Sequence, residues 1–246
     1  MQTCYLTDTG KIRDHNEDSV IILNNDKGEC LLAVADGMGG HKAGEVASAI
    51  VINHLTEEFY NLDSIGDKEH AIDFLRNIVT EMNHKIFEYT KENPDSKGMG
   101  TTFVCAIQTK DYLLYGNIGD SSGFVIKNHK LTKVTKDHTL VNLLVSTGEL
   151  TPEEAKYHPR KNVLMRALGA NNPIEIDIFD VDPNIDGILL CSDGLTNMLT
   201  ESQIEKVLME DKTIEEIVQK LINKANARGG NDNISVAYLK NESGDV

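Results

Sequence analysis

Four aspartates in this sequence stand where an apolar run meets glycine, an arrangement that suits cation chemistry. They are Asp36, Asp120, Asp193 and Asp232. A single Asp-Gly pair is typical of an ordinary turn. Four such carboxylates at the ends of expected buried strands indicate instead one shared site, because glycine lets backbone carbonyls and amides approach whatever the carboxylates hold.

The donor atoms of such a site are all oxygens. Oxygen ligands favour Mg²⁺ or Mn²⁺ over softer metals, and the sequence has no single-loop calcium pattern. His15, His41 and the other histidines are dispersed and lack metal-ligand spacing. Two hard cations about 3.5–4 Å apart can share a hydroxide and present it in line to a phosphorus atom. The carboxylates therefore suit hydrolysis of a phosphate ester.

Arg13 opens a second polar segment that ends at Asp18. Its guanidinium can hold two phosphate oxygens at once. Glu17 and Asp18 can reach the metals through water. The alternative for Arg13 is an ordinary surface salt bridge.

Composition places the chain among globular proteins. Its 246 residues suffice for one large domain or two small ones, with 40% hydrophobic and 26% charged residues. The formal net charge of −15 argues against nucleic acid or an anionic membrane surface as the main partner. Part of this acidity fits a carboxylate cluster that cations neutralise, and a generally acidic, solvated surface accounts for most of it.

The cysteines indicate a reducing compartment. Cys4, Cys30, Cys105 and Cys191 are scattered, three of them within apolar runs, and no Cys-x-x-Cys pair occurs. The N-terminus does not resemble a signal peptide, and no apolar run has the length of a membrane span. We therefore expect a cytoplasmic protein without membrane insertion.

Apolar periodicity predicts strands interrupted by two blocks of helices. The expected strands are 3–7, 19–24, 30–35, 101–108, 112–117, 123–127, 130–135, 174–181, 187–191 and 234–239. The expected helices are 43–60, 72–91, 201–209 and 213–227. Segment 138–168 is looser and contains a helix start at Thr151-Pro152-Glu153-Glu154. Many strands with segregated helix pairs argue for a single α+β domain over residues 1–246, with its sheets face to face and its helices outside.

Seven short motifs run the length of the chain: Arg13-x-x-Asn16-Glu17-Asp18, Asp36-Gly37-Met38-Gly39-Gly40-His41, Gly98-Met99-Gly100-Thr101-Thr102, Gly119-Asp120-Ser121, Asp137-His138, Ser192-Asp193-Gly194-Leu195 and Gly230-Asn231-Asp232-Asn233-Ile234. In this order they resemble the metal-dependent protein phosphatases, the type 2C serine/threonine phosphatases, in their single-domain bacterial form. The resemblance implies a four-layer α-β-β-α sandwich of two antiparallel sheets flanked by helix pairs. It implies Mn²⁺- or Mg²⁺-dependent hydrolysis of phosphoserine and phosphothreonine by a metal-bridging hydroxide, and it makes segment 138–168 a flap beside the active site.

The resemblance also implies how two metals are held. Asp36 would bridge both ions, and the carbonyl of Gly37 would complete one coordination sphere. Asp193 and Asp232 would hold the metal opposite. Asp18 would contribute through water.

Two further roles come from the same resemblance. Asp120, together with Asp193, matches the pair that binds a third and weaker metal in bacterial members. Arg13 would orient the substrate phosphate. The expected catalytic residues are thus Arg13, Asp36 and Asp193.

The chain departs from the family pattern at two positions. Eukaryotic members have a histidine, taken as the general acid, where this chain has Met38, and a thioether cannot protonate the leaving group. Metal-bound water, His41 or another group is left for that role. Many bacterial members have an arginine where this chain has Ser122, which puts the behaviour of Asp120 in question but not the two-metal core.

We therefore expect a metal-dependent serine/threonine protein phosphatase that acts as a monomer. Its partners would be a bacterial serine/threonine kinase and other phosphoserine or phosphothreonine proteins. Three alternatives are a catalytically weak relative that serves as a phosphoprotein-binding module, a hydrolase of small phosphate esters, and a calcium-binding structural protein. The last would need neither Arg13 nor the cluster Asn16-Glu17-Asp18.

Overall fold

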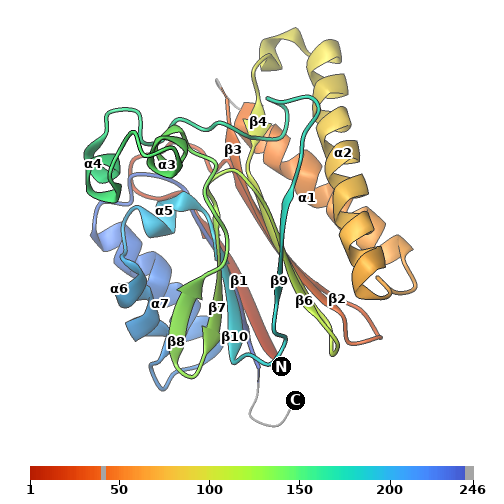
Figure 1. Cartoon of the computed structure of the whole chain (residues 1–246), viewed down its shortest axis with the longest axis vertical. Helices are drawn as coiled ribbons and strands as arrows, with labels where there is room; N and C mark the ends of the chain where they lie inside the picture. The colour runs from red at the N-terminus through yellow and green to blue at the C-terminus, as the bar shows by residue number, and fades with distance from the viewer. Residues whose placement is uncertain (40–42, 242–246) are drawn as a thin grey trace.

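The computed structural model describes residues 1–39 and 43–241, which form two antiparallel sheets packed between pairs of helices (Figure 1). The first sheet contains, in spatial order, β1 (Gln2–Asp8), β11 (Ile234–Lys240), β10 (Gly187–Cys191), β7 (Ser122–Lys127) and β8 (Lys130–Lys133). The second contains β2 (Asp18–Asn24), β3 (Cys30–Met38), β5 (Phe103–Gln108), β6 (Leu113–Ile118) and β9 (Asp177–Val181), with β4 (Gly100–Thr101) paired to β3.

Helices cover the outer face of each sheet. Those on the second sheet are α1 (Ala43–Asn61) and α2 (Lys68–Glu92), and those on the first are α5 (Asp193–Thr196), α6 (Glu201–Leu208) and α7 (Ile214–Ala227). The flap (residues 138–168) carries α3 (Leu140–Ser146) and α4 (Pro152–Tyr157) and projects above one end of the sandwich (Figure 1). A 3₁₀ turn, Pro94–Ser96, follows α2. The predicted four-layer α-β-β-α sandwich is confirmed.

The packing of the core explains why the sequence of β3 begins with an uninterrupted run of apolar residues. Leu31 and Ala33 face the layer of α1 and α2, whereas Leu32 and Val34 face the opposite sheet. Side chains alternate along a strand, so a strand buried on both faces must be apolar throughout. The apolar layer between the sheets fixes their separation and hence the distance between residues carried by different sheets.

Two predicted strands were wrong in detail, and one helix was missed. The expected strand 101–108 is divided at Thr102, which donates its N–H to the carbonyl of Asp36 and accepts the N–H of Asp36 through its hydroxyl, both at 2.9 Å. The expected strand 174–181 begins only at Asp177. The single-turn helix α5, which starts at Asp193, was not predicted at all.

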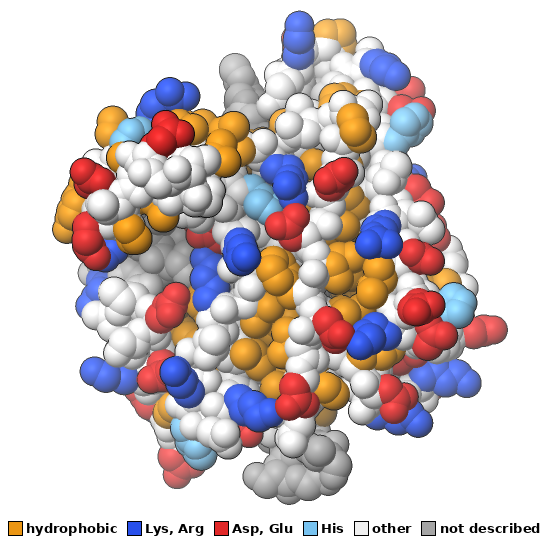
Figure 2. All heavy atoms as spheres, viewed as in Figure 1, with side chains coloured by type: hydrophobic (Ala, Val, Ile, Leu, Met, Phe, Trp, Pro, Cys, Tyr) orange, Lys and Arg blue, Asp and Glu red, His pale blue; other side chains and the backbone are white. Residues whose placement is uncertain are grey.

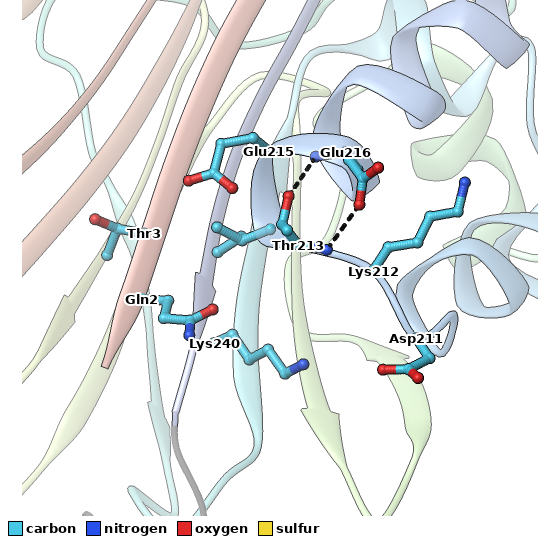
Figure 3. Close-up of a pocket in the computed structure, with 9 residues that line it drawn as sticks. Gln2, Thr3, Asp211, Lys212, Thr213, Glu215, Glu216 and Lys240 are labelled. Atoms are coloured by element: carbon cyan, nitrogen blue, oxygen red, sulfur yellow. Dashed lines mark hydrogen bonds between the residues drawn. The ribbon is translucent and has the colours of Figure 1, made fainter.

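The helix starts follow the capping rules. Thr151 caps α4 with a capping box, as its position before Pro152 predicts. Figure 3 shows the same device at α7, where Thr213 and Glu216 exchange hydrogen bonds of 3.1 and 3.3 Å. These bonds satisfy the backbone N–H groups of Thr213 and Glu216, which could otherwise bind an anion. We therefore interpret the pocket beside β1 in Figure 3 as part of the N-terminal cap of α7.

All four cysteines are free thiols, and three of them (Cys30, Cys105 and Cys191) are buried as predicted. Within the described residues, no helix combines the length and the apolarity that crossing a membrane would require.

Truncating the layer between the sheets should destabilise the protein strongly. We expect Leu32→Ala to lower the free energy of unfolding by about 2–5 kcal/mol, because it removes a fully buried side chain and leaves a cavity. Leu143→Ala, at a site 47% exposed, is the matched control and should change it by less than about 0.5 kcal/mol. Denaturant titration measures both values, and equal effects would contradict the assignment of this core.

Candidate active site

Strand pairing brings two carboxylates into direct opposition. Asp18 and Asp36 are Cα partners in the antiparallel ladder of β2 and β3. Like charges in that position repel each other. Burial, the largest cause, raises the pKa of Asp18 to about 7 even though Ser192 donates a 2.7 Å hydrogen bond to its Oδ2. Burial first and the charge of Asp18 second raise the pKa of Asp36 well above its usual range.

The backbone around Asp36 is held rigidly. Its carbonyl accepts hydrogen bonds from the hydroxyl of Thr101 and the N–H of Thr102, each at 2.9 Å. The next residue, Gly37, donates its N–H to the carbonyl of Glu17 at 3.1 Å and packs against the backbone of Gly44. A side chain at position 37 would overlap both neighbouring backbones, so only glycine allows this close approach.

Asp193 is the first residue of α5, directly after β10. Its Oδ2 accepts a 2.9 Å hydrogen bond from Asn197, one turn later. Gly194 packs so closely on the carbonyl of Asn233 that a side chain would not fit there. This contact brings the start of α5 against the segment that carries Asp232.

Asp232 pairs with Arg13 through a 2.9 Å bond between Oδ2 and Nη2. Asn233 fixes the approach of the two segments, because its amide donates to the carbonyls of Thr9 and His15 and its Oδ1 accepts the N–H of Glu17, all at 2.9 Å. The arginine side chain is 49% exposed, and an ion pair at that exposure contributes little to stability. Arg13 is therefore free to exchange its partner.

Asp120 reaches the same region from the loop between β6 and β7. Gly119 precedes it with φ +102° and packs on Thr102, where a side chain would clash. Burial, the largest cause, and the charge of Asp193, the second, raise the pKa of Asp120 to about 7. Burial and then the charge of Asp232 raise the pKa of Asp193 to about 6.

These side chains surround one cavity of about 370 Å³ at the end of the sandwich. Its walls include the predicted residues Arg13, Asp36, Gly37, Asp120, Asp193 and Asp232. Asp18 lies behind the wall, where it is buried and bonded to Ser192. The flap contributes Asn162 and Leu164, whose individual positions the sequence did not reveal.

The unsatisfied oxygens of the cavity fit a hard cation. Within residues 1–39 and 43–241, no group of three or more His, Cys, Asp or Glu side chains is arranged to hold a metal as it stands. Protein donors instead bind one oxygen of Asp18, one oxygen of Asp193 and both oxygens of Asp232. The buried Oδ1 atoms of Asp18 and Asp193 and the buried Oε1 of Glu17 have no hydrogen-bond partner among the described residues. Carboxylate oxygens in this state suit Mg²⁺ or Mn²⁺.

The structure brings together all the predicted site residues that it describes. Met38 lines the cavity, whereas Gly40 and His41, the latter a candidate proton donor, lie outside the described residues. Ser122, where many bacterial relatives have arginine, is buried, and its hydroxyl has no hydrogen-bond partner within the described residues. The positioning roles of Asn233 and Ser192 were missed, because their bonds join segments far apart in sequence.

Comparisons with known proteins find relatives along nearly the whole chain. Residues 11–236 match the family model described as protein phosphatase 2C. The serine/threonine phosphatase stp of Listeria monocytogenes is 41% identical over 243 residues, which cover 98% of this chain and 96% of the relative. Protein phosphatase PhpP of Streptococcus pneumoniae is 34% identical over 242 residues, 97% of each chain.

Solved structures give the same result. The serine/threonine phosphatase Stp1 of Staphylococcus aureus superposes with a TM-score of 0.92 at 37% identity, covering 98% of this chain and 95% of that one. The serine/threonine phosphatase PstP/Ppp of Mycobacterium tuberculosis superposes with a TM-score of 0.86 at 35% identity, covering 98% of each chain.

The raised carboxylate pKa values predict a pH-dependent stability in the presence of chelator. Asp18 and Asp120 have a pKa of about 7 in the fold, against 3.8 in the unfolded chain, so the folded state binds more protons between these values. The free energy of unfolding should therefore fall as pH rises from about 4 to about 7. We expect a lower melting temperature at pH 7.5 than at pH 5.5.

Added Mn²⁺ should raise the melting temperature more at pH 7.5 than at pH 5.5, because protons then no longer compete for the carboxylates. Asp120→Asn removes one of these titrating groups and should make the pH dependence in chelator shallower. Differential scanning calorimetry checks each point. A melting temperature that changes with neither pH nor Mn²⁺ would contradict the assignment of a cluster of carboxylates that repel one another.

Proposed function

Since the chain belongs to the protein phosphatase 2C family and is a protein-serine/threonine phosphatase, we propose that residues 1–246 form one catalytic domain that uses Mn²⁺ or Mg²⁺ to hydrolyse phosphoserine and phosphothreonine in proteins. The observation that best supports this proposal is the cluster of buried, mutually repelling carboxylates beside a half-exposed arginine. Such a cluster is costly in the absence of cations, and the guanidinium of a neighbouring arginine matches the geometry of two phosphate oxygens.

Two ions would share the residues at the centre of the cavity. Asp36, whose carboxylate is buried and whose backbone is fixed by Thr102, would bridge both. The carbonyl of Gly37 would complete one coordination sphere. Asp193 and Asp232 would hold the second ion. Asp18, behind the wall, would act through water.

A third and weaker position would lie between Asp120 and Asp193. The influence of the Asp193 charge on the pKa of Asp120 supports their proximity. Ser122 provides a short hydroxyl where many relatives have arginine, so the loop of Asp120 lacks that cationic neighbour. We expect this position to be filled last.

When bound, the divalent cations supply a hydroxide nucleophile at neutral pH and offset the charge of the phosphate. Arg13 binds the phosphate oxygens by exchanging its exposed bond to Asp232, and this orients the phosphorus in the cavity. The departing serine or threonine oxygen requires a proton. Met38 cannot donate one, so the proton comes from another group at the cavity.

The substrates and partners are proposed on the chemistry of the family. We propose that this phosphatase reverses the action of a serine/threonine kinase in the cytoplasm, acting as a monomer on the kinase and its targets. In cells that encode the chain, its deletion should increase phosphothreonine on that kinase. Unchanged phosphorylation of the kinase and of its targets would refute this pairing.

Hydrolysis of a phosphothreonine peptide by the purified chain tests the reaction. Phosphate release should require Mn²⁺ or Mg²⁺, stop with chelator, and fall at least about a hundredfold in Asp193→Asn, which keeps the size of the side chain but loses its charge. Asp26→Asn, at an exposed turn remote from the cavity, is the matched control and should retain full activity.

Two other outcomes would change the conclusion. Release of phosphate from a small ester but not from any phosphopeptide would favour a small-molecule hydrolase. Binding of the phosphopeptide without release, in the presence of metal, would favour a phosphoprotein-binding module.

Arg13→Lys tests the phosphate contact separately. Lysine keeps the charge but loses the two-pronged geometry, so we expect KM for the phosphopeptide to rise about ten- to a hundredfold. The number of Mn²⁺ ions bound, measured by calorimetry, should stay the same. An unchanged KM would show that Arg13 makes only its salt bridge with Asp232.

A further inference from the structure

The base of the flap is tied to the predicted metal site at both of its ends. His138, at the entrance, accepts the N–H of Met165 on its carbonyl at 2.8 Å, and Leu140 donates to Val163 at 2.8 Å, which closes the base. At the C-terminal end of the flap, Leu168 exchanges two 3.0 Å hydrogen bonds with Thr101, the residue that binds the carbonyl of Asp36. Hydrogen bonds therefore connect the flap to the backbone segment that carries Asp36.

The imidazole of His138, at the N-terminal end of the flap, makes a hydrogen bond through each of its two ring nitrogens. The backbone N–H of Gly119 donates to Nδ1 of the ring at 3.1 Å, and the backbone N–H of His138 donates to the carbonyl of Gly119 at 2.9 Å. A backbone N–H can only donate, so Nδ1 is the acceptor and the ring proton is on Nε2. Nε2 then donates to Oδ2 of Asp177 at 3.1 Å.

Asp177 receives a second donor from the other end of the flap. Nη1 of Arg166 binds its Oδ1 at 2.6 Å and also reaches the carbonyl of Glu175 at 3.3 Å. Burial alone would raise the pKa of Asp177, but the bonds from His138 and Arg166 lower it, so the carboxylate stays ionised and holds both donors. Basic, acidic and histidine side chains gather beside the flap, toward the middle of the face shown in Figure 2.

We propose that His138 is a positioning residue that links the flap to Asp120: the chain of contacts Arg166–Asp177–His138–Gly119 transmits the position of the flap to the carboxylate at the third cation position. This inference rests on the proposed function, because it assigns Asp120 to a cation. Asp120 directly follows Gly119, whose φ of +102° and contact with Thr102 leave its N–H aimed at the ring. Losing the acceptor frees the loop that orients Asp120.

Two substitutions separate the functions of the ring. His138→Asn places an amide oxygen near the position of Nδ1 and keeps the acceptor for Gly119, whereas His138→Gln places a donor near Nε2 and keeps only the bond to Asp177. Arg166→Gln breaks the chain of contacts at its far end without touching Gly119. His84→Gln, on the outer face of α2, is the matched control.

Calorimetric titration with Mn²⁺ gives the affinity of the weakest site directly, without relying on activity. We expect that site to weaken about tenfold in His138→Gln, which corresponds to one lost hydrogen bond to a buried group. It should weaken about threefold in Arg166→Gln and in His138→Asn, which each break the link through Asp177 but keep the acceptor for Gly119, and stay within about twofold of the original in His84→Gln. The two tighter sites should be unchanged in all four variants.

Two results would overturn the proposal. One is a weakest-site affinity in both His138→Gln and Arg166→Gln equal to that of the unmodified chain. The other is a loss in His138→Asn as large as in His138→Gln, which would indicate a packing role for the ring. Failure of the proposed function is distinguishable, because the unmodified chain would then bind no Mn²⁺ and release no phosphate.

Discussion

Repulsion among buried carboxylates is the constraint on which this structure depends. Asp18 and Asp36 face each other across a ladder, and Asp193 and Asp120 add their charges from other elements. The donors that hold these side chains in place are mainly neutral hydroxyls and amides, such as those of Ser192 and Asn197. Neutral donors fix the geometry but leave the negative charge uncompensated, which is what a site for hard cations requires.

The sandwich supplies the rigidity that such a cluster needs. Asp36 comes from the second sheet, and Asp193 and Asp232 come from segments that adjoin the first, so the tightly packed layer between the sheets sets how far apart they stand. Glycines at 37 and 194 then allow backbone contacts that any side chain would prevent. Arg13, a cationic residue of the cavity wall, is half exposed to solvent, so exchanging its partner costs little.

The sequence predicted the architecture well, because apolar periodicity and segregated helix pairs are local signals. It also predicted that Asp36, Asp120, Asp193 and Asp232 lie together, since each is within two residues of a glycine at a strand end, whereas Asp18 came from the polar segment that Arg13 opens. It did not predict the break at Thr102 or the turn of α5, because both are imposed by partners distant in sequence, Asp36 and Asn233. The bonds of His138 are hidden for the same reason: a histidine in a loop gives no sign of which carboxylate or N–H it will meet.

The link between Asn233 and the first loop has a consequence for how the protein is made. Its amide bonds to the carbonyl of His15 across 218 residues, so this contact of the first polar loop forms only after residue 233 has been synthesised. Helices and hairpins can form earlier, but a site built from both ends of the sequence closes only with the last strand. A chain that stopped before residue 232 would therefore lack Asp232 and Asn233 and the bonds that join them to the first polar loop.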